Sequence, residues 1–191
     1  MNTATKAALR PGNALQPKIN PRNVSNNLED RALAEALQPG KKLRDRTVSI
    51  TDGSKKKLSA LAGPEGLILY FYPRDNTPGC TKEACSFRDN HARLKKLGYG
   101  LVGVSTDSVR SHQSFTEKQN LNFPLIADEE HALAEACGVY GEKKLYGKSY
   151  MGITRTTFIL DPELRVRRVY DKVKVDGHTE QILGDLKSDG N

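Results

Sequence analysis

The hydrophobic and polar positions of this 191-residue chain change period several times along its length. Residues 67–72 are apolar without interruption, as expected of a strand covered on both faces, and 101–105 form a second such run. Residues 79–97 instead space their apolar or inward-facing groups alternately by four and three, which predicts a helix. Those groups are Cys80, Ala84, Phe87, His91 and Leu94.

The remaining pattern continues this alternation of strands and helices. Strands are expected at 46–51, 123–127, 156–160 and 166–170, and helices from Asp107 or Ser108, over 129–137 and over 179–187. A turn at Asp161-Pro162 joins the last two strands, whereas Lys55-Lys56-Lys57 reads as a solvated charge run beside a turn. Strand–helix alternation followed by a hairpin and a helix predicts a three-layer α/β domain.

The N-terminal segment has a different composition. Residues 1–27 contain no acid, four basic residues and three prolines, so we expect a mobile arm without a core. A solvated tail, an organelle-targeting peptide and a nuclear or nucleic-acid-binding arm all fit that composition. Residues 28–37 predict a short helix closed by Pro39-Gly40.

Charge and cysteine content limit the function classes. The net charge is +7, but residues 1–46 carry nine Lys/Arg against four Asp/Glu, so the rest is nearly balanced. Nucleic-acid binding by the folded part is therefore not indicated. The longest apolar run is too short to cross a membrane, and we expect no secretory signal. Three cysteines argue against a secreted disulfide framework, which favours a cytoplasmic location, or an organelle or nucleus if residues 1–27 are an address.

The junction of the first buried strand with the next helix carries the candidate chemistry. A loop bounded by Pro73 and Pro78-Gly79 leads into a helix whose first turn holds Cys80. The free N–H groups and the macrodipole of a helix N-terminus favour a thiolate, the nucleophilic form of cysteine. Cys85 follows five residues later and is placed to trap an oxidised product.

Helix geometry separates these two cysteines. Five residues of α-helix place their Cα atoms roughly 8–9 Å apart. A disulfide needs about 4.4–6.8 Å. If Cys80 and Cys85 form a bond, the start of the helix must therefore unwind.

Other interpretations of the cysteines remain open at this point. Both members of the pair could be buried, inert thiols, because free cysteine is among the most buried residue types. The chain has no CxxC motif and its four histidines lack ligand spacing, so no metal site is expected. Cys137, at a predicted helix end among Ala and Val, is either a buried structural thiol or a second resolving partner for Cys80.

Residues 73–80, PRDNTPGC, resemble the peroxiredoxin Pro-x-x-x-Thr-x-x-Cys signature. The offset to Cys85 is similar to that of the bacterioferritin-comigratory-protein / peroxiredoxin Q branch, whose members are atypical 2-Cys thiol peroxidases. Further similarity lies in the segments FRD, VSTDS, FPLIAD and YMGITRTTFILD. The resemblance covers residues 41–187 and implies a thioredoxin-like fold with a central mixed sheet flanked by helices. Residues 1–40 are then an extension and 188–191 a tail.

The resemblance also implies roles for six residues. Cys80 would be the peroxidatic thiolate and Cys85 the resolving thiol, joined in a redox-active disulfide. Thr77 would hydrogen-bond the thiolate and the peroxide, and Arg155 would favour the thiolate and stabilise charge on the breaking O–O bond. Pro73 would shield the site from water and Glu83 would orient Arg155. From the sequence alone, Glu83 is equally well interpreted as an acid in the first helical turn that interacts favourably with the helix dipole.

The function implied is reduction of hydrogen peroxide and organic hydroperoxides by a monomer recycled by thioredoxin, without metal, flavin or haem. A peroxide sensor that passes its disulfide to a partner protein is a second interpretation. A binding or chromatin-associated module that uses the basic arm is a third.

Overall fold

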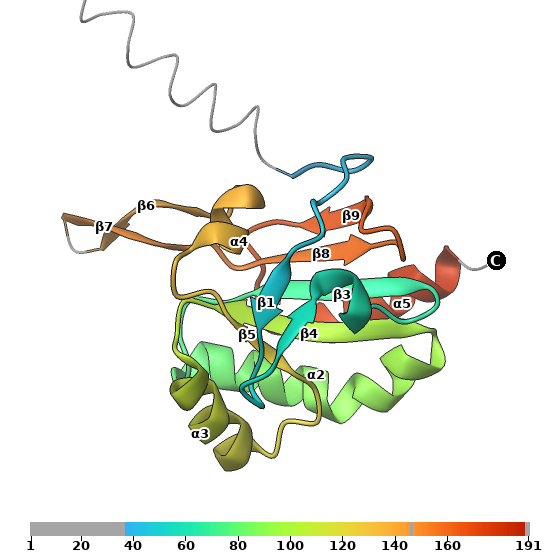
Figure 1. Ribbon diagram of the computed structural model, residues 1–191, viewed down its shortest axis with the longest axis horizontal. Coiled ribbons are helices and arrows are strands. Elements are labelled where there is room, and N and C mark those ends of the chain that lie inside the picture. The colour runs from blue at the N-terminus through green and yellow to red at the C-terminus, as the bar shows by residue number, and fades with distance from the viewer. Residues whose placement is uncertain (1–36, 146, 190–191) are drawn as a thin grey trace, which may run out of the picture.

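In the computed structural model (Figure 1), residues 37–145 and 147–189 are described. The expectations for residues 1–27 and for the helix over 28–37, apart from Leu37, lie outside them. A five-stranded sheet of order β5-β4-β3-β8-β9 forms the centre. Its strands are β3 (Gly66–Phe71), β4 (Tyr99–Ser105), β5 (Leu125–Ala127), β8 (Thr156–Leu160) and β9 (Val166–Tyr170).

The sheet is mixed. β3 pairs in parallel with β4, and β4 with β5, whereas β8 runs antiparallel to both β3 and β9. Every residue of β3 is buried, because strands pair with both its edges and side chains cover both its faces. The uninterrupted apolar run therefore predicted the central strand correctly.

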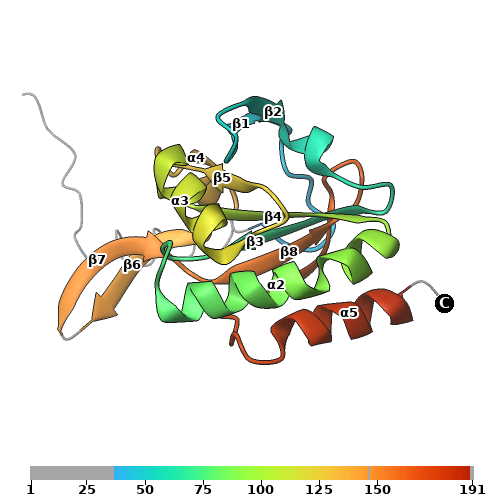
Figure 2. The same ribbon diagram turned by 90° about the horizontal axis from the view of Figure 1, so that it is seen from below.

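Three helices cover one face of the sheet: α2 (Pro78–Lys96), α3 (Val109–Gln119) and α5 (His178–Ser188). α2 and α5 run side by side along the sheet (Figure 2). Their apolar residues pack against alternate residues of the strands. This cluster includes Ile68, Tyr70, Ala84, Phe87, Leu94, Phe115, Ile159, Ile182 and Leu183.

The opposite face is covered by smaller elements: the hairpin of β1 (Thr47–Ser49) and β2 (Lys55–Lys57), the 3-10 helix η1 (Leu58–Leu61) and α4 (Ala132–Ala136). The core on this face includes Val48, Leu58, Leu67, Leu69, Phe71, Val104, Leu133, Ala134 and Phe158. Two cores on either side of one mixed sheet confirm the predicted three-layer α/β architecture. No helix in the described ranges has the length and apolar character needed to cross a membrane.

Two local features differ from the simple pattern. Lys55-Lys56-Lys57 is exposed beside a turn, as predicted, but its backbone also forms β2, which pairs with β1. The helix expected over 129–137 begins only at Ala132, because His131 has a φ of 59°, outside the helical region. The Asp128 carboxylate accepts hydrogen bonds from the amides of Leu133 and Ala134, which satisfies the start of this short helix.

A further hairpin was not predicted. β6 (Tyr140–Leu145) and β7 (Lys148–Ile153) form a two-stranded ribbon that projects from the body of the domain (Figures 1 and 2). Much of this ribbon is polar, so its residues lack the alternation typical of a half-buried strand. Its second strand leads directly into the segment that contains Arg155.

Candidate active site

Cys80 lies in the first turn of α2, as the sequence predicted. Thr77 has extended backbone angles and precedes the helix, and Pro78 occupies the first helical turn, where its fixed φ suits the conformation and its missing N–H costs nothing. This start directs Cys80 toward the sheet, where only 2% of its surface is exposed. The thiol is therefore buried at a helix N-terminus.

Arg155 contacts Cys80 from a distant part of the chain. It lies between β7 and β8, and its Nη2 donates a hydrogen bond to Cys80 Sγ over 3.2 Å. Its Nη1 donates to Glu83 Oε2, one helical turn beyond the cysteine. The structure thus brings Cys80, Glu83 and Arg155 together. The guanidinium thus places a positive charge against the buried sulfur.

Glu83 is almost fully buried, with 1% of its side chain exposed. Burial raises the pKa of Glu83 to about 7, although the positive charge of Arg155 acts in the opposite direction. Its second carboxylate oxygen, Oε1, is buried and has no hydrogen-bond partner among the described residues. Glu83 therefore holds Arg155 through one oxygen only.

Thr77 and Pro73 occupy the loop between β3 and α2. The Thr77 hydroxyl donates to the carbonyl of Arg74 over 3.0 Å, which turns the loop back on itself. The Thr77 hydroxyl therefore forms a hydrogen bond with the Arg74 carbonyl rather than with the Cys80 sulfur. Pro73 is exposed and lines a pocket of ≈ 210 Å³ whose opposite wall is the β6–β7 ribbon, including Tyr150 and Met151.

Cys85 points to a different part of the fold. It is half-buried, and its Sγ donates a long hydrogen bond of 3.7 Å to Gln119 Oε1 at the end of α3. Cys80 and Cys85 are both free thiols on an intact helix, so the structure represents the reduced state.

Cys137 lies in the core on the opposite face of the sheet from Cys80. Only 1% of its surface is exposed, and this burial raises the pKa of its thiol well above the usual range. This environment agrees with the structural interpretation of Cys137. It gives no support to a second resolving partner.

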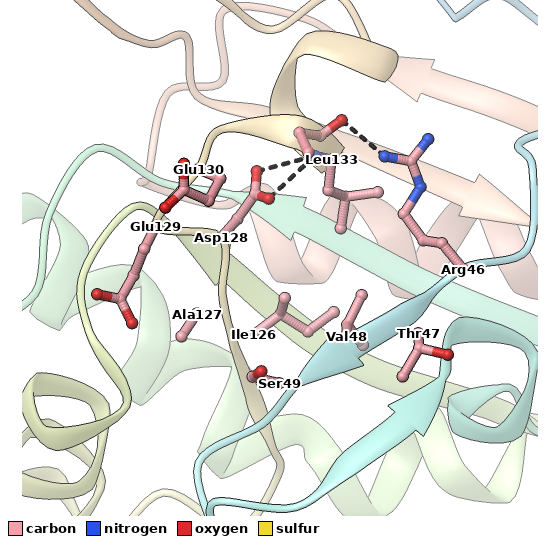
Figure 3. A pocket seen from close by; sticks show the side chains of 11 residues that line it. Arg46, Thr47, Val48, Ser49, Ile126, Ala127, Asp128, Glu129, Glu130 and Leu133 are labelled. Atoms are coloured by element: carbon pink, nitrogen blue, oxygen red, sulfur yellow. Dashed lines mark hydrogen bonds between the residues drawn. The ribbon is translucent and has the colours of Figure 1, made fainter.

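Another pocket lies between β1, β5 and the start of α4 (Figure 3). Arg46 reaches across it and donates to the carbonyl of Ala132 over 2.7 Å. Asp128 caps α4 from the other side. Both polar groups are thus bound to the first three residues of α4, and none of the eleven lining residues is a cysteine. Within residues 37–145 and 147–189, no three His, Cys, Asp or Glu side chains are grouped as metal ligands.

The sequence analysis missed two residues beside the site. Asp75 is a buried acid in the loop before α2, and it lies 2.9 Å from the buried ring of His112 in α3. His112 precedes Phe115 by three residues, the spacing of an inward helical stripe, which was the available signal. Asp75 lies between Arg74 and Asn76, and a polar run of this kind gives no sign that one member is buried.

Comparison with known proteins provides independent information. Residues 39–169 match the model of the AhpC/TSA family. The Peroxiredoxin Bcp of Bacillus subtilis is 46% identical over 151 residues, which cover 79% of this chain and 96% of that protein. The Peroxiredoxin Bcp of Escherichia coli is 42% identical over 136 residues, covering 71% and 86%.

Solved structures show the same relationship. A PrxQ of Xylella fastidiosa superposes with a TM-score of 0.76 at 35% identity, covering 81% of this chain and 98% of that one. The bacterioferritin comigratory protein of Xanthomonas campestris, described by its alkyl peroxide reduction activity, gives 0.71 at 42% identity and covers 76% and 92%.

Proposed function

Because this chain belongs to the AhpC/TSA family and is a peroxiredoxin of the Bcp/PrxQ type, we propose that Cys80 is the thiol with which it reduces hydroperoxides. The observation that carries this assignment is the hydrogen bond of 3.2 Å from Arg155 Nη2 to Cys80 Sγ. It gives one buried thiol a cation that favours its nucleophilic form.

In the first step, the Cys80 thiolate attacks one oxygen of the hydroperoxide. The O–O bond breaks, the leaving oxygen takes a proton and departs as water or an alcohol, and Cys80 becomes a sulfenic acid. Arg155 stabilises the negative charge that develops on the leaving oxygen, because its two nitrogens are already directed into the site. Glu83 holds the guanidinium in this position. Thr77 binds the peroxide once its hydroxyl turns away from Arg74.

In the second step, Cys85 attacks the sulfenic sulfur, a disulfide forms and water leaves. The first turns of α2 unwind for this step, since the two thiols face different parts of the fold. An external dithiol, which we propose to be thioredoxin, returns two electrons and two protons by thiol–disulfide exchange.

The substrates proposed are hydrogen peroxide and organic hydroperoxides. The pocket between Pro73 and the β6–β7 ribbon supports the second class, because Tyr140, Tyr150 and Met151 offer apolar surface to an organic group. The related Xanthomonas campestris protein is described by alkyl peroxide reduction. A monomeric state and a cytoplasmic location remain predictions from the sequence.

Peroxide turnover coupled to NADPH through thioredoxin and its reductase tests the cycle. We expect turnover by wild type and Cys137→Ala, and none by Cys80→Ser. Cys85→Ser should be oxidised once and then stay oxidised, since it lacks the thiol that forms the disulfide. Peroxide-treated wild type should lose ~2 Da, the mass of two thiol hydrogens, through a Cys80–Cys85 link.

Two results would contradict this proposal. Full turnover by Cys80→Ser would show that another group reduces the peroxide. Formation of the disulfide without reduction by thioredoxin would leave the peroxide chemistry intact but exclude thioredoxin as the reductant.

A further inference from the structure

The loop between β3 and α2 is anchored by one buried side chain, that of Asp75. Across residues 73–79, all of which the structure describes, only Asp75 is buried, with 6% of its surface exposed. Asn76, the next residue, has a φ of 56°, a conformation rare for a residue other than glycine. The chain thus turns sharply just after it places Asp75 in the interior.

Four groups from three parts of the fold bind Asp75. The Tyr72 hydroxyl donates to its Oδ1 over 2.8 Å, and the Ser111 hydroxyl donates to its Oδ2 over 2.7 Å. His112 Nδ1 lies 2.9 Å from the same Oδ2. The backbone amide of Asp75 donates to Asp107 Oδ2 over 2.9 Å. The loop is therefore tied to the end of β3, to the end of β4 and to α3.

His112 is held at both of its ring nitrogens. Its Nε2 lies 3.0 Å from the carbonyl oxygen of Ile126, which can only accept, so Nε2 carries a hydrogen. Its Nδ1 lies 2.9 Å from Asp75 Oδ2. Burial raises the pKa of Asp75, but the hydrogen bonds with His112, Ser111 and Tyr72 outweigh it, so the net pKa lies below its usual value. The fully buried ring of His112 and the carboxyl group of Asp75 thus form one hydrogen-bonded pair.

The Asp75–His112 pair lies beside the segment that rearranges, but outside it. The residues that must move to join Cys80 with Cys85 begin at the start of α2. The groups that bind Asp75 belong to α3 and to the ends of β3 and β4. We propose that Asp75 and His112 are positioning residues for peroxide reduction. They fix the loop before Cys80 so that the thiol returns to its reactive geometry each time the helix refolds.

This inference rests on the proposed function, and it predicts that the two steps of the cycle respond differently. Oxidation of Cys80 requires the loop and Arg155 to be correctly positioned relative to the thiol. A displacement of about 1 Å is enough to slow such a step ~100-fold. Formation of the disulfide takes place after the helix has opened, when the loop geometry matters less. Loss of the Asp75–His112 pair should therefore slow the first step and leave the second nearly unchanged.

The test compares Asp75→Asn, His112→Asn and the double variant with wild type. The rate of Cys80 oxidation by hydrogen peroxide is measured by competition with horseradish peroxidase. The rate of disulfide formation is measured by acid quench and mass spectrometry. We expect each single variant to be oxidised at least ~10-fold more slowly, with disulfide formation within about twofold of wild type. The double variant should be no slower than the worse single one, because each single change already breaks the pair.

The control is Asp52→Asn, which removes a carboxylate from an exposed turn and should leave both rates unchanged. If the Asn variants fail to fold, Tyr72→Phe and Ser111→Ala each remove one donor to Asp75 and keep the pair. They should slow oxidation by a smaller factor in the same direction.

Oxidation rates within twofold of wild type in folded variants would overturn the inference, as would equal slowing of both steps. These outcomes differ from failure of the proposed function, in which wild type itself would not react with peroxide or Cys80→Ser would react equally well.

Discussion

Replacing Glu83 by Gln tests whether burial or the charge of Arg155 controls the carboxyl group beside Cys80. The Glu83 side chain is 1% exposed, and only one of its oxygens has a hydrogen-bond partner. Burial raises its pKa from 4.5 to about 7 against the opposing effect of Arg155. The comparison is made between Cys80→Ser and Cys80→Ser/Glu83→Gln, so that the two proteins differ only in the side chain at position 83 and neither contains the Cys80 thiol.

The expected magnitude follows from these two pKa values. The folded state binds the Glu83 proton more tightly than the unfolded state, so the stabilisation is complete below pH 4.5 and is lost as pH rises through 7. A separation of about 2.5 pH units corresponds to about 3 kcal/mol. Because glutamine does not titrate, the stability of Cys80→Ser relative to the double variant should fall by about 3 kcal/mol from pH 4.5 to pH 8.

Urea unfolding followed by far-ultraviolet circular dichroism measures this difference, since the chain has no tryptophan for fluorescence. Measurements at pH 4.5, 5.5, 6.5 and 8 cover the range. Cys80→Ser/Glu163→Gln, which alters an exposed acid at the β8–β9 turn, is the control and should show no such slope. A stability difference that stays constant with pH, or that rises, would refute the reasoning and show that Arg155 outweighs burial.

Three further predictions concern thiol burial, the packing of the sheet and the start of α2. Iodoacetamide should alkylate Cys85 in the native protein but not Cys137, whose thiol is buried and has a raised pKa. Peptide mass mapping measures the labelling, and rapid labelling of Cys137 would show that its thiol is not buried. Gly66→Ala should lower the free energy of unfolding by about 3 kcal/mol, because the new Cβ would lie 1.9 Å from the Leu160 carbonyl oxygen. Gly184→Ala is the matched control, since its Cβ meets open space within α5 and should stabilise by up to about 1 kcal/mol in the same urea assay. Lys82→Gly changes an exposed residue between Cys80 and Cys85 and should lower the stability of the helix by about 1 kcal/mol. Disulfide formation, measured by a quench experiment, should then be roughly fivefold faster, and an unchanged or slower rate would argue against unwinding of α2.

The parts of the fold that could be predicted are those whose environment imposes a period on the sequence. β3 is buried on both faces and reads as one apolar run, while α2 covers the sheet with one stripe. The β6–β7 ribbon has no such constraint, because it projects from the body and depends on pairing between its own strands. The late start of α4 depends on the backbone of His131, which no side-chain pattern records.

The candidate site divides in a similar way. Cys80 could be located from its place at a strand–helix junction, and resemblance selected Arg155 and Glu83, which the structure brings beside it. The pairing of Asp75 with His112 could not be predicted, because it joins residues 37 positions apart and Asp75 is the one buried member of its loop. The roles of Thr77, Pro73 and Cys85 remain predictions.

The position of Glu83 between Cys80 and Cys85 links the folding of α2 to the reduction potential of the proposed disulfide. Glu83 belongs to the segment that rearranges in the proposed cycle when the two sulfurs join, and that rearrangement would separate its carboxylate from Arg155. The free energy of forming the helix then stabilises only the reduced protein. Each 1.4 kcal/mol by which the folded helix is favoured raises the potential by about 30 mV and makes the disulfide easier to reduce. The helix that presents the nucleophile thereby also sets how readily a reductant can restore it.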